Sequence, residues 1–231
     1  MTSSERGCCT LSTAVEDYLK AVFHLESADE ACTTTAVAAR VEVSVPSASM
    51  MLKRLRAQQL VADAGTDDRA VALTDHGRRH ARSVVRRHRL LETFLAEVLE
   101  LPWDAVHDEA EVLEHALSPK LEARISALLG DPSVDPHGDP IPPADGPHEE
   151  SWPQALDQVE DGSVFTVTRV SDREPDALRY LAERGIELGA RLRVLRREPF
   201  GGPLVVGVDD AEVSLGTALA GRIHGQVAAS S

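Results

Sequence analysis

The chain has 231 residues, a length that is enough to bury the core of one or two domains. Of these residues, 42% are hydrophobic and 27% are charged. No stretch approaches the roughly 18 consecutive apolar residues of a membrane span, and the N-terminal residues lack the apolar core of a signal peptide. The three cysteines, Cys8, Cys9 and Cys32, do not suggest a disulfide framework. These features predict a cytoplasmic protein with no membrane segment.

Charge is distributed unevenly along the chain. The formal net charge is −14, which for the sequence as a whole argues against binding to nucleic acid. Residues 40–89 nevertheless contain eleven Lys or Arg against five Asp or Glu, a local charge of +6 that leaves −20 for the remainder. A basic segment in an otherwise acidic protein is typical of a module that binds phosphate groups.

Four predicted elements follow one another in the first third of the chain. Residues 11–26 carry apolar side chains at helical spacing, and a short helix is predicted over 34–40. Residues 44–60 predict a third helix, because Pro46 fits its first turn. In residues 61–74, apolar and polar side chains alternate on both sides of a polar Gly-Thr-Asp-Asp tip, and this pattern predicts a hairpin. This order is that of a winged helix-turn-helix.

The third of these helices supplies the predicted DNA contacts. In a winged helix-turn-helix the N-terminal residues of this helix enter the major groove. Hydroxyl side chains suit phosphates and groove edges, proline suits the thymine methyl group, and basic side chains suit phosphates. The alternatives are a helical unit that only packs and a winged helix that binds protein; the local positive charge favours DNA. The predicted DNA-binding residues are Ser44, Pro46, Ser47, Ser49, Met50, Lys53 and Arg54.

Two segments after the hairpin carry residue types that bind metal ions. Residues 75–99 predict one long helix with a His and a Glu four positions apart, and residues 107–115 place two His and two Glu on one helical face. Facing pairs on adjacent helices are how helical bundles build metal sites. The alternative is a pair of solvated helix faces, which describes most charged runs. The candidate ligands are His88, Glu92, His107, Glu111, Glu114 and His115.

The last hundred residues change character. Residues 131–153 contain seven of the thirteen prolines, which predicts a linker or an extended segment, with His137 and His148 exposed to solvent. Residues 156–227 combine short β patterns, Gly turns and one short helix, which predicts a small SH3-like barrel.

The chain resembles the diphtheria toxin repressor and iron-dependent regulator family of metal-activated transcriptional repressors. The resemblance is carried by EDYLKAVFHLE, SVPSASMMLKRL, LTDHGRR, RRHRLLE, VHDEAEVLEH and HGDPIP, and it covers residues 11–145 well. It implies an α+β protein. The implied parts are a winged helix-turn-helix DNA-binding domain (1–80), a helical metal-binding and dimerisation domain (81–146), a linker (147–157) and an SH3-like, FeoA-like domain (158–231).

The family's ligand positions transfer onto this sequence residue by residue. Its C-terminal domain contributes a Glu and a Gln, which fall on Glu174 and Ala177, and Asp176 is a substitute for the missing Gln. The resemblance thereby implies two metal sites per subunit. These are a primary site of Asp17, Glu111, Glu114 and His115, and an ancillary site of His88, Glu92, His107 and Glu174.

Two departures from the iron-type members indicate the metal. Those members have Met at the position of Asp17 and Cys at that of Glu111, whereas this chain has the pair found in the family's manganese regulators. Lys20 stands where short manganese regulators carry a further Glu, and a cation cannot be a ligand. We therefore expect two separated sites that bind Mn²⁺, with Fe²⁺ as the alternative.

The resemblance implies a repressor that controls metal-ion homeostasis genes. It also implies a homodimer on a palindromic double-stranded DNA operator, with up to two dimers on one operator. An iron-activated repressor of iron uptake genes is the main alternative. A metal-dependent hydrolase and a metal-storage protein are more remote, because the sequence has no nucleophile elbow, P-loop or H-E-x-x-H motif and storage leaves the winged helix unexplained.

Overall fold

The chain folds into two compact units, Met1–Val85 and Arg86–Ser231, in a computed structural model. Cys8, Cys9 and the predicted hairpin tip at 65–69 lie outside the described residues. The structure describes residues 11–64, 70–146, 148, 150 and 152–228.

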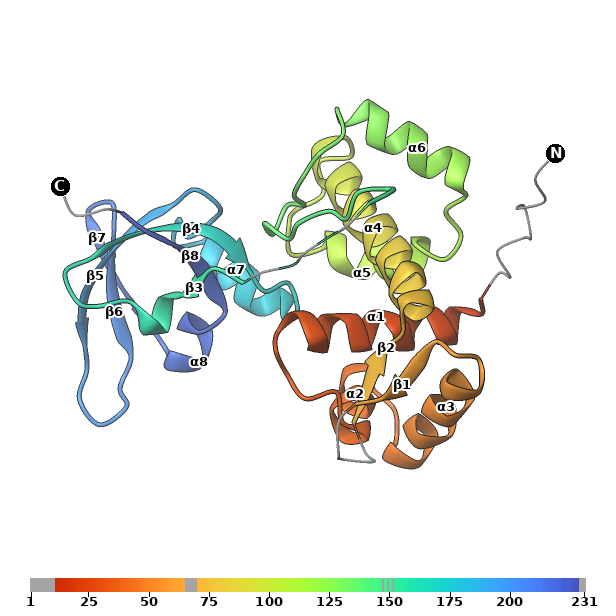
Figure 1. Ribbon diagram of the computed structural model, residues 1–231. Helices are drawn as coiled ribbons and strands as arrows, with labels where there is room; N and C mark the ends of the chain where they lie inside the picture. The colour runs from red at the N-terminus through yellow and green to blue at the C-terminus, as the bar shows by residue number, and fades with distance from the viewer. Residues whose placement is uncertain (1–10, 65–69, 147, 149, 151, 229–231) are drawn as a thin grey trace. The chain divides into compact units, whose positions relative to one another are not determined.

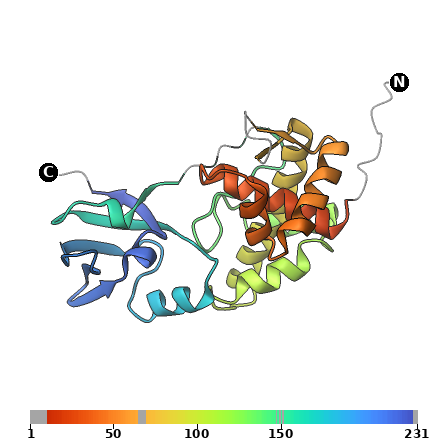
Figure 2. The same cartoon turned by 90° about the horizontal axis from the view of Figure 1, so that it is seen from below.

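The first unit has the predicted order of three helices and a hairpin, and its helices lie together in two views (Figures 1 and 2). Side-chain caps explain where two helices begin: the Thr33 hydroxyl accepts from the amide of Ala36, and the Ser44 hydroxyl accepts from that of Ser47. The elements are α1 (Thr13–Ser27), α2 (Thr34–Arg40), α3 (Val45–Ala57), β1 (Val61–Asp63), β2 (Val71–Leu73) and the start of α4 (Asp75–Glu97).

An apolar core holds this unit together. Leu19 of α1 and both Leu52 and Leu55 of α3 are completely buried in it. Glu26 adds polar contacts to this core. Its carboxylate accepts a hydrogen bond from the amide of Leu73 and forms an ion pair with Arg78 at 2.6 Å. The hairpin strands and the long helix are thereby fixed to the end of α1.

The second unit begins within α4, which runs without a break to Glu97 and confirms the long helix expected there. Two shorter helices follow, α5 (Val106–Leu113) and α6 (Pro119–Leu128). The face predicted over 107–115 is therefore only partly helical. Ser118 caps α6 and precedes Pro119. The helical conformation is disfavoured for a residue that precedes proline, so the chain turns between the two helices.

The C-terminal part of this unit is a six-stranded antiparallel sheet of order β3-β8-β4-β5-β6-β7 around its own apolar core. One helix, α7, was predicted from the sequence and is confirmed, as is the α+β class. Among the described helices none is long and apolar enough to cross a membrane. The elements are β3 (Gln154–Ala155), η1 (Leu156–Gln158), β4 (Val164–Val170), α7 (Pro175–Ala182), β5 (Arg191–Arg197), β6 (Leu204–Val208), β7 (Ala211–Leu215), α8 (Thr217–Ala220) and β8 (Ile223–Val227).

Residues 135–142 of the proline-rich segment are packed, so of the two predictions made there, a linker or an extended segment, the linker was wrong over these residues. Ile141 joins the core formed by α4, α5 and α6. Gly138 has a positive φ of 86°, and a Cβ at that position would meet the carbonyl oxygen of Thr168 at 2.0 Å. Val170, two residues after Thr168 on β4, donates its amide N–H to the carbonyl of His137 at 2.9 Å. Only glycine allows this approach of the segment to the sheet.

Candidate metal centre

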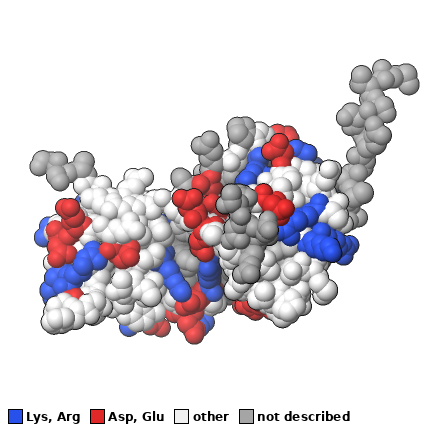
Figure 3. All heavy atoms as spheres, turned by 60° about the horizontal axis from the view of Figure 1, so that its bottom comes forward, with Lys and Arg blue, Asp and Glu red and all other residues white. Residues whose placement is uncertain are grey.

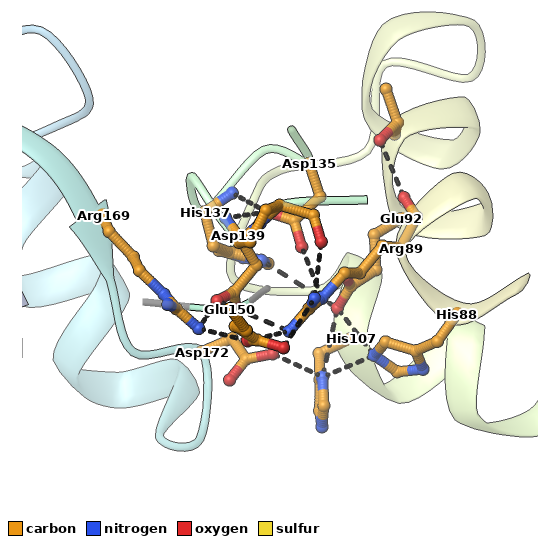
Figure 4. A network of polar contacts seen from close by, with 12 residues as sticks. His88, Arg89, Glu92, His107, Asp135, His137, Asp139, Glu150, Arg169 and Asp172 are labelled. Carbon is orange, nitrogen blue, oxygen red and sulfur yellow. Dashed lines mark hydrogen bonds and ion pairs between the residues drawn. The ribbon is translucent and has the colours of Figure 1, made fainter. Parts of the chain in front are cut away.

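Three predicted ligands converge on one point between α4 and α5. His88 and Glu92 follow one another by a helical turn on α4 and are both buried. The Nε2 atom of His88 lies 2.9 Å from Oε1 of Glu92 and 3.1 Å from Nδ1 of His107 on α5. Nδ1 of His107 is also 3.1 Å from the same Glu92 oxygen. Sequence reasoning placed these three together, and the structure does so (Figure 4).

The sheet supplies the fourth member, which is Asp172 rather than Glu174. Oδ2 of Asp172, just beyond β4, lies 3.1 Å from Nδ1 of His107. Glu174 begins α7 and pairs instead with Arg222 at 2.7 Å, with more than half of its side chain exposed. Asp176 pairs with Arg179 on the exposed surface. We call His88, Glu92, His107 and Asp172 the ancillary cluster.

The donor atoms of the ancillary cluster fit a divalent cation. One atom from each residue lies within 4.8 Å of the others, and several of the spacings are close to 3 Å. Neighbouring ligands of a six-coordinate ion with bonds of about 2.1 Å stand about 3.0 Å apart. The 3.1 Å contact between Nε2 of His88 and Nδ1 of His107 is a hydrogen bond in which one ring donates and the other accepts, and both nitrogens can serve as ligand atoms once neither carries hydrogen.

A second group shares Glu92 with the ancillary cluster. The carboxylate of Asp135 and the ring of His137 lie within 4.8 Å of Glu92, and all three residues are buried. Among the described residues, Oε2 of Glu92, Oδ2 of Asp135 and Nδ1 of His137 are buried without a hydrogen-bond partner. Buried polar atoms are normally satisfied, so the donor atoms of these three residues fit a bound cation. We call Glu92, Asp135 and His137 the inner group.

The loop around Gly138 holds this group in place. Oδ1 of Asp135 accepts from the amides of His137 and Asp139, both at 2.9 Å. The ring of His137 stacks on Trp103, and its Nε2–H donates to the carbonyl of Trp103 at 2.7 Å. A neutral ring held in this way presents Nδ1 as a free ligand atom. The expectation that His137 is exposed was wrong, and so was that for His148, whose side chain is 6% exposed.

Electrostatics show how the ancillary cluster is balanced without a metal. Burial opposes ionisation of Glu92, but His88 and His107 hold its pKa well below the usual range. Burial likewise opposes ionisation of Asp172, yet His107 lowers its pKa. In return, and against the effect of burial, Asp172 and Glu92 raise the pKa of His107 to about 11. A metal ion requires the neutral imidazole, so a bound cation would replace this proton.

Two buried guanidinium groups lie beside the clusters (Figure 4). Arg89 of α4 donates to Glu150 at 2.7 Å and to the carbonyl of Pro140 at 2.6 Å. Arg169 of β4 donates to the same Glu150 oxygen at 2.8 Å, pairs with Asp139, and stacks over the ring of Trp152. These residues connect the helices to the sheet through charge.

Of the remaining predicted ligands, Glu111 lies in the last turn of α5, and Glu114 and His115 follow directly after it. Glu114 is completely buried, and its Oε1 is 3.4 Å from Nε2 of His115 while its Oε2 is 2.5 Å from Nδ1 of His88. Glu111 is one turn earlier, 3.7 Å from Nε2 of His107. Asp17 lies on α1 in the first unit, where it is half-buried.

The predicted DNA-contacting residues share one exposed surface of the first unit. All seven lie at the start of α3 or along its outer face, and all are exposed, with Met50 at 72%. Ala48, Leu52 and Leu55 occupy the opposite face. Figure 3 shows basic side chains gathered on this unit.

Three metal-type residues were missed: Asp135, His137 and Asp172. The first two stand in VDPHGDPIP, which contains the HGDPIP motif that was used to identify the family but was interpreted as a linker. Asp172 stands two residues before the Glu that was chosen, in a region of weak similarity. The available signal was the D-P-H-G-D spacing, because an Asp that caps its own loop orients the residues after it.

Family comparisons agree with the geometry of both units. The chain matches the DNA-binding domain of the iron-dependent repressors over residues 10–66. It matches their metal-binding and dimerisation domain over residues 74–143 and the FeoA domain over residues 154–227. A DNA-binding domain, a metal-binding and dimerisation domain and a FeoA domain are therefore present.

Individual relatives point the same way. The iron-dependent repressor IdeR of Mycobacterium tuberculosis is 37% identical over 132 residues, which make up 57% of this chain and 56% of that protein. The chain thus matches little more than half the length of that relative. The diphtheria toxin repressor of Corynebacterium jeikeium is 31% identical over 169 residues, 71% of this chain and 70% of that protein.

Solved structures extend the likeness to nearly the whole chain. A manganese-dependent transcriptional repressor in complex with manganese is 47% identical, with a TM-score of 0.86 over 93% of this chain and 100% of that one. The manganese regulator SloR is 33% identical, with a TM-score of 0.79 over 93% of this chain and 98% of that one. The chain belongs to the diphtheria toxin repressor and iron-dependent repressor family, whose members are metal-dependent, DNA-binding transcriptional repressors and not enzymes.

Proposed function

We propose that this protein is a manganese-activated repressor of metal-ion homeostasis genes. The observation that carries the proposal is the convergence of two imidazoles and two carboxylates, from three separate segments, within 4.8 Å in the ancillary cluster. The likeness to a repressor whose structure holds manganese supports the choice of metal.

The primary site would be held by Glu111, Glu114 and His115, and the family pattern adds Asp17 of the first unit. Oxygen donors dominate this set, and carboxylates suit Mn²⁺, whereas thioether and thiolate ligands favour softer ions. Since Mn²⁺ has the lowest intrinsic affinity of the first-row divalent ions, selectivity must come from coordination number and geometry.

The ancillary site would be held by His88, Glu92, His107 and Asp172. Asp172 replaces Glu174 in this proposal because of its contact with His107. Asp135 and His137 offer further donors toward Glu92, so the same site can complete its coordination from the inner group. We propose two sites per subunit on this basis.

The output would be binding to a palindromic operator by a homodimer, with up to two dimers on one operator. The exposed start of α3 would read the major groove, as in other helix-turn-helix proteins. Exposed apolar side chains on α5 and α6, including Val112 at 74% and Leu128 at 66%, supply a dimer face. Trp103, which lies before α5, is partly buried against the core of the C-terminal sheet. We keep the domain boundaries 1–80, 81–146, 147–157 and 158–231 as a proposal.

The test is operator binding titrated without oxygen against free Mn²⁺ and free Fe²⁺. The native protein should respond at lower free Mn²⁺ than Fe²⁺. The double change Asp17→Met, Glu111→Cys installs the iron-type pair and should shift the response toward Fe²⁺. A native protein that responds at lower free Fe²⁺ would replace the manganese proposal with the iron-activated alternative.

A further inference from the structure

His88 lies between the two groups of metal-type residues and contacts both. Its Nε2 faces the ancillary cluster, 2.9 Å from Glu92 and 3.1 Å from His107. Its Nδ1 faces the other way, 2.5 Å from Oε2 of Glu114. His88 is 5% exposed and Glu114 is completely buried, so little water competes for these contacts.

The chemistry of the partners assigns the proton on this ring. An ionised carboxylate only accepts hydrogen bonds, so the contact with Glu114 requires that Nδ1 carry hydrogen. In the neutral ring the lone pair is then on Nε2, which points at the ancillary cluster. A histidine that binds metal through one nitrogen usually donates from the other to a carboxylate, which fixes the ring and strengthens it as a ligand.

The carboxylate in this pair is a predicted metal ligand in its own right. Glu114 turns one oxygen to His88 and the other toward His115, 3.4 Å away. The orientation of the Glu114 carboxylate is therefore set in part by the His88 ring. A cation held by Nε2 of His88 would fix the orientation of that ring, and the ring would in turn fix the Glu114 carboxylate beside His115.

We propose that His88 couples the two metal sites, because Nε2 serves the ancillary site while Nδ1–H orients Glu114 for the primary site. This inference rests on the proposed function and adds a direct route between its two sites. Coupling of this kind is reciprocal, so filling either site strengthens the other. Because this route consists of the His88 side chain alone, one substitution at that residue should remove the coupling.

The test is a double-mutant cycle on Mn²⁺ affinity, measured by electron paramagnetic resonance of free Mn²⁺ during titration of the full chain. Asp172→Asn weakens the ancillary site without touching the contact between His88 and Glu114. It should lower primary-site affinity about tenfold, within the usual range of coupling energies. His115→Ala identifies the primary site in the titration. The stoichiometry of the native protein should be two Mn²⁺ per subunit, as proposed.

His88→Gln and His88→Asn then divide the two functions of the ring. The Gln amide reaches the position of Nε2 and loses the donor to Glu114, whereas the Asn amide keeps a donor near Nδ1 and loses the ancillary ligand. In the His88→Gln background, Asp172→Asn should cause no further loss of primary-site affinity. His88→Asn should retain more primary-site affinity than His88→Gln.

Two results would overturn this inference in distinguishable ways. If Asp172→Asn lowers primary-site affinity equally in the native and His88→Gln backgrounds, the two sites exist but His88 does not couple them. If the native chain binds fewer than two Mn²⁺ per subunit, the proposed pair of sites fails and the coupling fails with it. Should His88→Gln not fold, as judged by circular dichroism, His88→Asn takes its place, because it lacks the ancillary ligand and so breaks the same route. Asp172→Asn should then lower primary-site affinity less in the His88→Asn background than in the native one, and equal effects in the two backgrounds would overturn the inference.

Discussion

The core of the first unit and the helix-to-sheet contact of the second unit are built from different kinds of buried side chain, apolar in the first and charged in the second. In the first unit, α1 and α3 meet through leucines such as Leu19, Leu52 and Leu55, which are fully buried. In the second, α4 meets the sheet through Arg89 and Arg169, each 2% exposed, and the carboxylates around them. The predicted site residues differ in the same sense, since the predicted DNA-contacting residues are exposed whereas His88, Glu92 and Glu114 are buried.

This difference shows where the protein can respond to a ligand. An apolar core is stable without any ion, because hydrophobic burial needs no charge partner. A buried polar contact is stable only while every charge has its partner, so adding or removing a cation changes its free energy strongly. The second unit is therefore the part of the chain that a metal ion can stiffen, and the first is the part that presents a fixed DNA-binding surface.

Removing one buried cation should break the polar contact and have the largest effect. Arg89→Met leaves Asp135, Asp139 and Glu150 with one guanidinium fewer, which should cost about 3–5 kcal/mol in the free energy of unfolding. Denaturant unfolding of the metal-free protein measures it. Arg196→Met, at an exposed pair on β5, is the control and should change stability little. Equal effects of the two changes would mean that the buried network contributes no more than a surface pair.

A cavity in the apolar core should act without regard to metal. Leu52→Ala should lower the free energy of unfolding of the first unit by about 2–5 kcal/mol, from lost burial and the cavity that remains. The loss should be the same with chelator and with Mn²⁺, because the residue lies in the apolar core of the first unit. A loss that depends on Mn²⁺ would show that the two kinds of burial are not independent.

The choice between two nearby carboxylates sharpens the account of the second unit. Asp172→Asn should weaken Mn²⁺ binding at the ancillary site by about 10–100-fold, the range seen when groups that support a metal site are lost. Glu174→Gln should leave it unchanged, since that carboxylate pairs with Arg222. Calorimetric Mn²⁺ titration of both variants measures this. The reverse result would restore Glu174 as the ligand.

The smallest effect should come from a single phosphate contact on the exposed face. Lys53→Ala should weaken binding to all DNA sequences about equally and reduce the salt dependence of log K by about one unit of slope. Fluorescence anisotropy at several salt concentrations measures both. Lys120→Ala, another exposed lysine but on α6, should leave DNA binding as it is. A change of base preference in Lys53→Ala would contradict its assignment to phosphate.

The sequence predicted those site residues that share a helix or adjacent helices. His88, Glu92 and His107 could be placed together because helical spacing puts them on facing stripes. The winged helix could also be predicted from the sequence, since the residues that cap its helices and form its hairpin are local signals. Asp172 could not be found in this way: its position depends on where β4 ends against another part of the unit, and a choice two residues away fitted the sequence as well.

The errors elsewhere have equally specific causes. The proline-rich segment was interpreted as a linker, yet Asp135 caps its own loop and Gly138 lets that loop approach β4, so the prolines lie in a packed loop. The helix expected to run through His115 ends at Leu113, because Ser118 and Pro119 begin the next one. Both signals were present in the sequence and were outweighed by composition and periodicity.

The most direct test of the central claim is operator binding by the native protein in chelator and in Mn²⁺ at fixed ionic strength. We propose that ions bound by buried residues of the second unit control DNA binding by the exposed face of α3. Binding should then be tight and salt-sensitive with Mn²⁺, and only weak and independent of sequence with chelator. His115→Ala should bind in both conditions as the native protein does in chelator. Equal operator affinity of the native protein with chelator and with Mn²⁺ would contradict the account.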